Sequence, residues 1–190
     1  NKGDNSIFLY SGSNAKITEE FVDEVLDKFQ KGDMLLLQNE INMIEYIVKK
    51  AYEKDMCIIL NPSPCNDVIK TIDFNMLSYI ILNEVEMSNL AECDNPKDGL
   101  KLFLKKYPKL KVVLTLGSEG SMYSDSEKSV FQPSFKVKVV DTTAAGDTFT
   151  GYFFAQTAIG SNVEKALKIA SIASAVAVSR NGASVSIPKL

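Results

Sequence analysis

The pattern of hydrophobic and polar positions divides the chain into two kinds of segment that alternate along its length. Short apolar runs predict strands at residues 6–12, 33–40, 56–61, 77–86 and 111–124, and the last of these folds back at a turn with glycines. Apolar residues at helical spacing predict helices at residues 18–29, 42–54, 98–108, 145–159 and 163–179. This order is typical of a mostly parallel sheet with helices on both faces. We therefore predict one three-layer α/β/α domain over residues 1–190.

Two local signals refine this picture. Thr18 is a suitable N-cap for the first helix, because Glu19 and Glu20 follow it where negative charge favours the helix dipole. The continuous apolar run at 33–40 predicts a buried parallel strand. In sheets of this kind, ligands bind beyond the carboxyl ends of the strands. The loops to search are therefore at residues 38–40, 61–63, 83–86, 115–120 and 141–147.

Composition narrows the classes of function. The chain has 190 residues, 45% of them hydrophobic and 24% charged, and a net charge of -3, which indicates a globular domain. Lys and Arg form no basic patch, so we expect no nucleic-acid partner. No apolar run is long enough for a membrane span, so we expect no membrane partner. The three cysteines form no Cys-x-x-Cys pair, which favours reduced thiols and a cytoplasmic location, and the absence of histidine excludes imidazole chemistry.

The stretch VVDTTAAGDTFTGYFFAQTA, at residues 139–158, combines small residues with an acid at the start of a predicted helix. If the helix begins near Ala144 or Ala145, the free N–H groups of its first turn can bind an anion, and Gly146 lets a phosphate approach the backbone. Asp147 can then accept a proton from a substrate hydroxyl. The alternative is that Asp147 is only a favourable first-turn acid and the alanines pack a helix.

Other loops carry weaker signals. Gly117 and Gly120 can form a turn beside a flat nucleotide, or an ordinary hairpin. The Walker and dinucleotide glycine motifs are absent. Asn83, Glu84 and Glu86 offer oxygens for water-mediated Mg²⁺ binding, or simply begin a helix. Glu40 ends an apolar strand, where it can hold sugar hydroxyls or cap the following helix.

Taken together, five motifs resemble the ribokinase-like (PfkB) carbohydrate kinases. DTTAAGDTFTG is similar to the signature of that family, with Ala144 in place of its first glycine, a departure typical of the ribokinase branch. NEVE resembles the Asn-x-x-Glu motif and TLGSEG the nucleotide loop. LLLQNE is similar to the strand whose terminal Glu contacts the sugar, and AVSRNGASVSIP resembles the loop that completes a monovalent-cation site.

The resemblance implies a role for each matched residue. It implies a catalytic base at Asp147 and an anion hole at Ala144, Ala145 and Gly146. It places ATP against Asn83, Thr115, Leu116, Gly117, Ser118, Glu119, Gly120 and Ser171, and the sugar against Glu40 and Asp147. Asn83 and Glu86 would organise Mg²⁺ and the phosphates. K⁺ would lie among Asp141, Thr143, Ala177, Arg180, Gly182 and Ser186, mostly through backbone oxygens.

The activity implied by the resemblance is ATP-dependent phosphorylation of a sugar hydroxyl, with D-ribose as the first expectation. Family members carry a Gly-Gly dipeptide and a small β-sheet lid upstream, and neither is recognisable here, so we expect the chain to be a piece of a longer kinase. The resemblance leaves a homodimer open for that enzyme. Three alternatives are another sugar or nucleoside kinase of the family, a non-catalytic nucleotide-binding fragment and a dehydrogenase; the missing glycine fingerprint disfavours the dehydrogenase.

Overall fold

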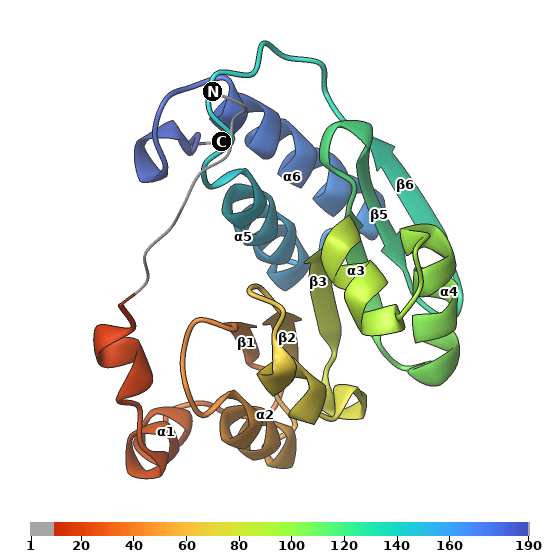
Figure 1. Ribbon diagram of the computed structural model, residues 1–190. Coiled ribbons are helices and arrows are strands. Elements are labelled where there is room, and N and C mark those ends of the chain that lie inside the picture. Colours follow the sequence, from red (N-terminus) through yellow and green to blue (C-terminus); the bar gives the residue numbers. More distant parts are fainter. Residues whose placement is uncertain (1–9, 190) are drawn as a thin grey trace.

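The computed structural model describes residues 10–189, and its strands form one six-stranded sheet in the order β1-β2-β3-β4-β5-β6 (Figure 1). Strands β1 to β4 are parallel, whereas β5 and β6 are antiparallel to their neighbours. The register pairs Gln38 with Asn61 and Asn83 with Thr115, so the polar residues that end these strands lie at one edge of the sheet. The strand bounds are β1 Met34–Gln38, β2 Cys57–Asn61, β3 Tyr79–Asn83, β4 Lys111–Thr115, β5 Gly120–Ser124 and β6 Ser129–Pro133.

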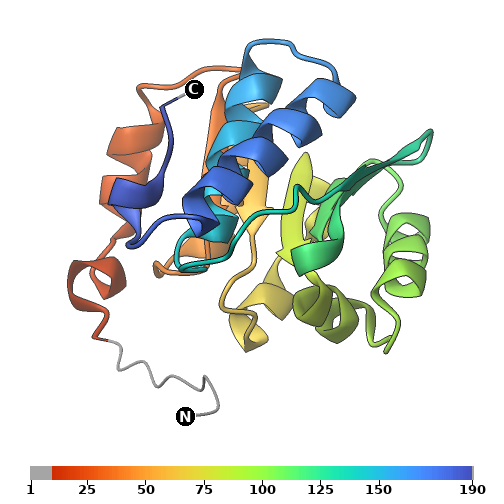
Figure 2. The same ribbon diagram turned by 90° about the horizontal axis from the view of Figure 1, so that it is seen from above.

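Helices cover both faces of this sheet, which confirms the predicted three-layer fold. One face carries a core built with α1, α2, α3 and α4, and the other a core built with α5 and α6 (Figure 2). Alternate residues of a strand pack into opposite cores: Ile80 and Leu82 of β3 belong to the first core, and Ile81 belongs to the second. The helix bounds are α1 Glu19–Leu26, α2 Ile44–Glu53, α3 Glu84–Ala91, α4 Pro96–Lys106, α5 Ala145–Ala158 and α6 Val163–Val178.

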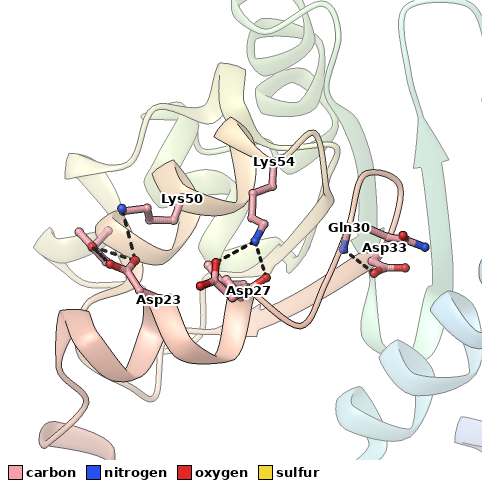
Figure 3. Close-up of polar contacts among 8 residues, drawn as sticks. Asp23, Asp27, Gln30, Asp33, Lys50 and Lys54 are labelled. Atoms are coloured by element: carbon pink, nitrogen blue, oxygen red, sulfur yellow. Dashed lines mark hydrogen bonds and ion pairs between the residues drawn. The ribbon is translucent and has the colours of Figure 1, made fainter.

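Polar contacts hold α1 against α2 at the surface (Figure 3). Thr18 caps α1 as predicted, because its hydroxyl accepts a hydrogen bond from the N–H of Phe21. Lys50 pairs with Asp23 at 3.3 Å, and Lys54 donates to the carbonyl of Leu26 at 2.7 Å. Exposed ion pairs contribute about 0.2–1 kcal/mol each, so these contacts fix the orientation of α1 more than they stabilise the fold.

Three predictions about strands need correction. The run at 33–40 forms β1, which is the outermost strand of the sheet formed by residues 10–189, and Leu36 is 47% exposed there, whereas the prediction had the strand buried. The run at 77–86 ends as a strand at Asn83, where α3 begins, because Asn83 caps that helix. The predicted strand at 6–12 lies largely outside the described residues, and Gly12 starts a short 3-10 turn.

The other predicted strands and helices are confirmed, including the return of the chain from β4 to β5. The helix start at residues 83–86, given above as the alternative to an Mg²⁺ site, is confirmed as the start of α3, whereas β6 was missed. Across residues 10–189, no helix is both long and apolar enough to cross a membrane.

Candidate active site

A cleft of about 910 Å³ opens at the carboxyl ends of the strands, between the end of β3, the β4–β5 turn, the start of α5 and the second half of α6. Eight of the predicted site residues line it: Asn83, Thr115, Gly117, Ser118, Gly120, Ala145, Gly146 and Ser171. These residues come from four segments that are far apart in the sequence. A cleft of this size, at this edge of an α/β sheet, is where a nucleotide-sized ligand is expected.

The turn between β4 and β5 forms one wall of the cleft. Gly117 has φ +51°, and a Cβ built on it would meet nothing within 4 Å, so this glycine leaves space. Gly120 has φ +133°, and a Cβ there would lie 2.1 Å from the carbonyl oxygen of Gln132. The first glycine therefore leaves room beside the cleft, whereas the second is required for the pairing of β5 with β6.

The start of α5 forms the wall that can bind an anion. Ala144 precedes the helix with φ 59° and ψ 15°, and no side chain caps the helix. The N–H of Ala145 donates to the carbonyl of Thr142 at 3.2 Å, and Thr148 N–H makes the first helical bond to Ala144 at 2.9 Å. Helix geometry leaves the N–H groups of Gly146 and Asp147, which lie between Ala145 and Thr148, without an intrahelical acceptor. These donors and the helix dipole suit a phosphate.

Space and support complete this helix start. A Cβ built on Gly146 would meet nothing within 4 Å, so the backbone is open to an approaching ligand. The hydroxyl of Ser174, on α6, donates to the carbonyl of Ala145 at 3.1 Å and holds the first turn in place. Asp147 follows directly, with an exposed side chain that is not part of the cleft lining. A carboxylate placed beside an anion site can accept a proton from an incoming hydroxyl.

Asn83 and Glu86 form a capping box at the start of α3. The side chain of Asn83 accepts from the N–H of Glu86 at 2.9 Å, and the Glu86 carboxylate accepts from the N–H of Asn83 at 3.0 Å. The second carboxylate oxygen of Glu86 accepts from the hydroxyl of Ser63. Each oxygen of this carboxylate thus accepts one hydrogen bond from a protein donor. In residues 10–189, no three His, Cys, Asp or Glu side chains are grouped as a metal site.

Asp141 joins the loop before α5 to the loop after α6. One carboxylate oxygen accepts from Thr143 N–H at 2.9 Å and the other from Gly182 N–H at 3.0 Å. Hydrogen bonds from the Thr143 side chain, and then from these two backbone groups, hold the pKa of Asp141 below its usual value. The guanidinium of Arg180 donates to the carbonyl of Ser186 at 3.4 Å. Carboxylate and carbonyl oxygens are of the type that hard cations bind.

A model of the pfkB family of carbohydrate kinases matches residues 1–190. The chain belongs to this family. It is 36% identical over 189 residues to ribokinase of Bacillus subtilis, a match that covers 98% of this chain and 62% of that enzyme. The chain thus spans about three-fifths of the length of that relative.

Solved structures agree with this assignment. The structure of ribokinase from Cryptococcus neoformans in complex with ADP is similar with a TM-score of 0.86 and 27% identity, over 98% of this chain and 65% of that one. Ribokinase of Arabidopsis thaliana, complexed with ribose and ATP, is similar with a TM-score of 0.80 and 25% identity, over 98% and 63%. The ribokinase-like fold predicted from the motifs is therefore confirmed.

Not every residue matched to the pfkB family lies at the cleft. Leu116 is 2% exposed and belongs to the core, and Glu119 points to Lys97, with 3.7 Å between the charged groups. Glu40 is exposed at the end of β1 and is not among the residues that line the cleft. The roles assigned to these three residues stay predictions.

The sequence reading missed a whole wall of the cleft in this pfkB-family chain. Beyond β6, the chain has no regular secondary structure and contributes Ser134, Phe135, Lys136, Val137 and Val139 to the lining. Ser134 fixes its course, because its N–H donates to the carbonyl of Glu119 at 3.2 Å and its hydroxyl to that of Ser118. The alternation of apolar residues with lysine at 135–139 was the available signal, since it is typical of extended chain.

Proposed function

We propose that this chain forms the ATP-binding and catalytic part of a kinase that transfers the γ-phosphoryl group of ATP to a hydroxyl of D-ribose. The observation that carries the proposal is the convergence of Asn83, the β4–β5 turn and the uncapped start of α5 on one cleft. The names of the relatives support the choice of substrate: the similar enzymes are ribokinases, and one was solved with ribose and ATP. Because the chain spans about three-fifths of such an enzyme, the activity is proposed for the complete gene product.

The proposed mechanism relies on positioning and electrostatics. The adenine nucleotide would lie along the β4–β5 turn and the face of α6 that carries Ser171, with its phosphates toward Ala145 and Gly146. Asp147 would take the proton of the sugar hydroxyl while that oxygen bonds to the γ-phosphorus and the bond to ADP breaks. The free N–H groups at the start of α5 would stabilise the charge on the transferring phosphoryl group. Glu40 would hold sugar hydroxyls.

Two cations would assist, and the donor groups present fit both. Mg²⁺, when bound with ATP, would neutralise phosphate charge. Asn83 and Glu86 would orient its waters. A monovalent ion such as K⁺ suits the oxygens of the loops joined by Asp141. We place the enzyme in the cytoplasm, because the three cysteines of this chain are free.

The test is a coupled assay of ADP release by the complete gene product, alongside the 190-residue chain, with a panel of pentoses, hexoses and nucleosides. We expect release that depends on ribose, with ³¹P NMR locating the new phosphate on a sugar hydroxyl. Preference for a nucleoside or another sugar would assign a different kinase of the family. ATP binding without transfer to any acceptor would favour the non-catalytic alternative.

A further inference from the structure

The loop after β2 makes a contact that links it to the nucleotide side of the cleft. In this loop, the hydroxyl of Ser63 donates to Oε1 of Glu86, which lies on α3. Glu86 is only 7% exposed, so a charged oxygen there is costly unless it receives a donor. The capping box with Asn83 supplies a donor to Oε2 alone. Ser63 is therefore the side chain that satisfies the other half of the buried carboxylate.

Ser63 is itself fixed in position by a group of asparagines. Its N–H donates to the Oδ1 of Asn61 at 3.1 Å. The buried side chain of Asn39 donates to the carbonyl of Pro64 at 2.6 Å and to Oδ1 of Asn66 at 3.0 Å. The backbone N–H of Asn39 also donates to the carbonyl of Asn61 at 3.2 Å. The loop that carries Ser63 is thus tied to the end of β1, and its hydroxyl has a defined direction.

Three cleft residues lie at the capping box. Asn83, Glu84 and Val85 form the start of α3, and all three line the cleft. The rotamer of Glu86 decides whether the N–H of Asn83 keeps its acceptor, and Ser63 restrains that rotamer. We propose that Ser63 is a positioning residue for nucleotide binding, which acts through Glu86 on the first turn of α3. The inference rests on the proposed function, because it concerns the same nucleotide site.

A merely structural hydrogen bond would behave differently. Its loss would lower the melting temperature, and nucleotide affinity would be unchanged. A positioning role predicts that nucleotide affinity falls together with the order of the α3 start. Ser63→Thr keeps the hydroxyl and should therefore keep both the nucleotide affinity and the order of the α3 start.

The experiment compares Ser63→Ala and Ser63→Thr with wild type, in the complete gene product. Ser161→Ala is the matched control: its hydroxyl donates to Oε1 of Gln156 at 2.8 Å, and neither residue lines the cleft. Titration with MgADP gives the dissociation constant, and amide hydrogen exchange reports the order of residues 83–86. For Ser63→Ala we expect the dissociation constant to rise roughly 5- to 20-fold and exchange to quicken at least about fivefold, because a bond to a charged group is lost.

Retention of both values within about twofold of wild type in Ser63→Thr and Ser161→Ala supports the proposal. An unchanged MgADP affinity in Ser63→Ala overturns it, whether exchange at residues 83–86 quickens or not. A loss of affinity in Ser63→Thr equal to that in Ser63→Ala also overturns it, because the hydroxyl would then not be the cause. If wild type binds no adenine nucleotide, the proposed function fails and this inference fails with it. If wild type binds MgADP and Ser63→Ala binds it equally well, only this inference fails.

Discussion

Ala144 has a backbone conformation that an alanine adopts only at a cost. Its φ of 59° and ψ of 15° lie in the left-handed region, where the Cβ crowds the following carbonyl and costs about 1–2 kcal/mol. Ala144→Gly removes this strain but gives the unfolded chain more freedom, which offsets about 0.4–1 kcal/mol. We therefore expect a net gain of about 0.5–1 kcal/mol in the free energy of unfolding. For a chain of 190 residues this raises the melting temperature by about 1–4 °C.

The neighbouring alanine provides the control for this experiment. Ala145 lies inside the first turn of α5, and its φ is not positive. Ala145→Gly should therefore lower stability by about 0.5–1 kcal/mol, the usual cost of glycine in a helix. Calorimetry and urea unfolding of both variants give the two values. A variant Ala144→Gly that melts at or below wild type, or that shifts in the same direction as Ala145→Gly, would refute the assignment of strain to Ala144.

Three further predictions follow from local geometry. Gly120→Ala should lose more than about 3 kcal/mol of stability, because its Cβ would strike the backbone of β6. Gly117→Ala should lose only about 1 kcal/mol and should weaken nucleotide binding more than folding. Urea unfolding and nucleotide titration of both variants test this. Burial, and then the hydrogen bond to Asp125, raises the pKa of Tyr123, so the contribution of this side chain to stability is constant below pH about 10 and falls above it; Tyr123→Phe should show less of this loss in urea unfolding at alkaline pH. MgADP affinity and activity should be higher in K⁺ than in Na⁺ at equal ionic strength, and Asp141→Asn should abolish the difference. Equal values for wild type in both salts would remove the reason to place an ion at the loops joined by Asp141.

The fold was predictable because local and global signals agree along most of the chain. The apolar inner face of α2, with Ile44, Ile47 and Val48, identified a helix before its partners were known. The burial of β1 was predicted wrongly for residues 10–189: a continuous apolar run indicates a strand with two covered faces, and Leu36 is exposed on the outermost strand that the structure describes. Strand order depends on which elements meet in space, and hydrophobic periodicity carries no such information.

The candidate site was predictable where a residue type has one plain physical use. Small residues before Asp147 indicated an open helix start, and the structure has an uncapped one. The contact of Glu86 with Ser63 was not predictable, because Ser63 is 23 residues away and its bond depends on the course of a loop. The segment at 134–139 that lines the cleft was missed for a related reason: the alternation of apolar residues with lysine does not say which surface the chain crosses.

The most direct test of the account measures kcat, MgADP affinity and melting temperature for Asp147→Asn. A general base, an anion site and a helix start would each change a different one of these quantities. Asp98→Asn is the control, since Asp98 is likewise the third residue of its helix, α4. If Asp147 is the general base, kcat of the complete gene product falls by about 10²–10⁴. MgADP affinity and melting temperature then stay close to wild type, as do all values for Asp98→Asn. A variant Asp147→Asn that turns over at nearly the wild-type rate, and loses only the few tenths to about 1 kcal/mol of a first-turn acid, would contradict the account.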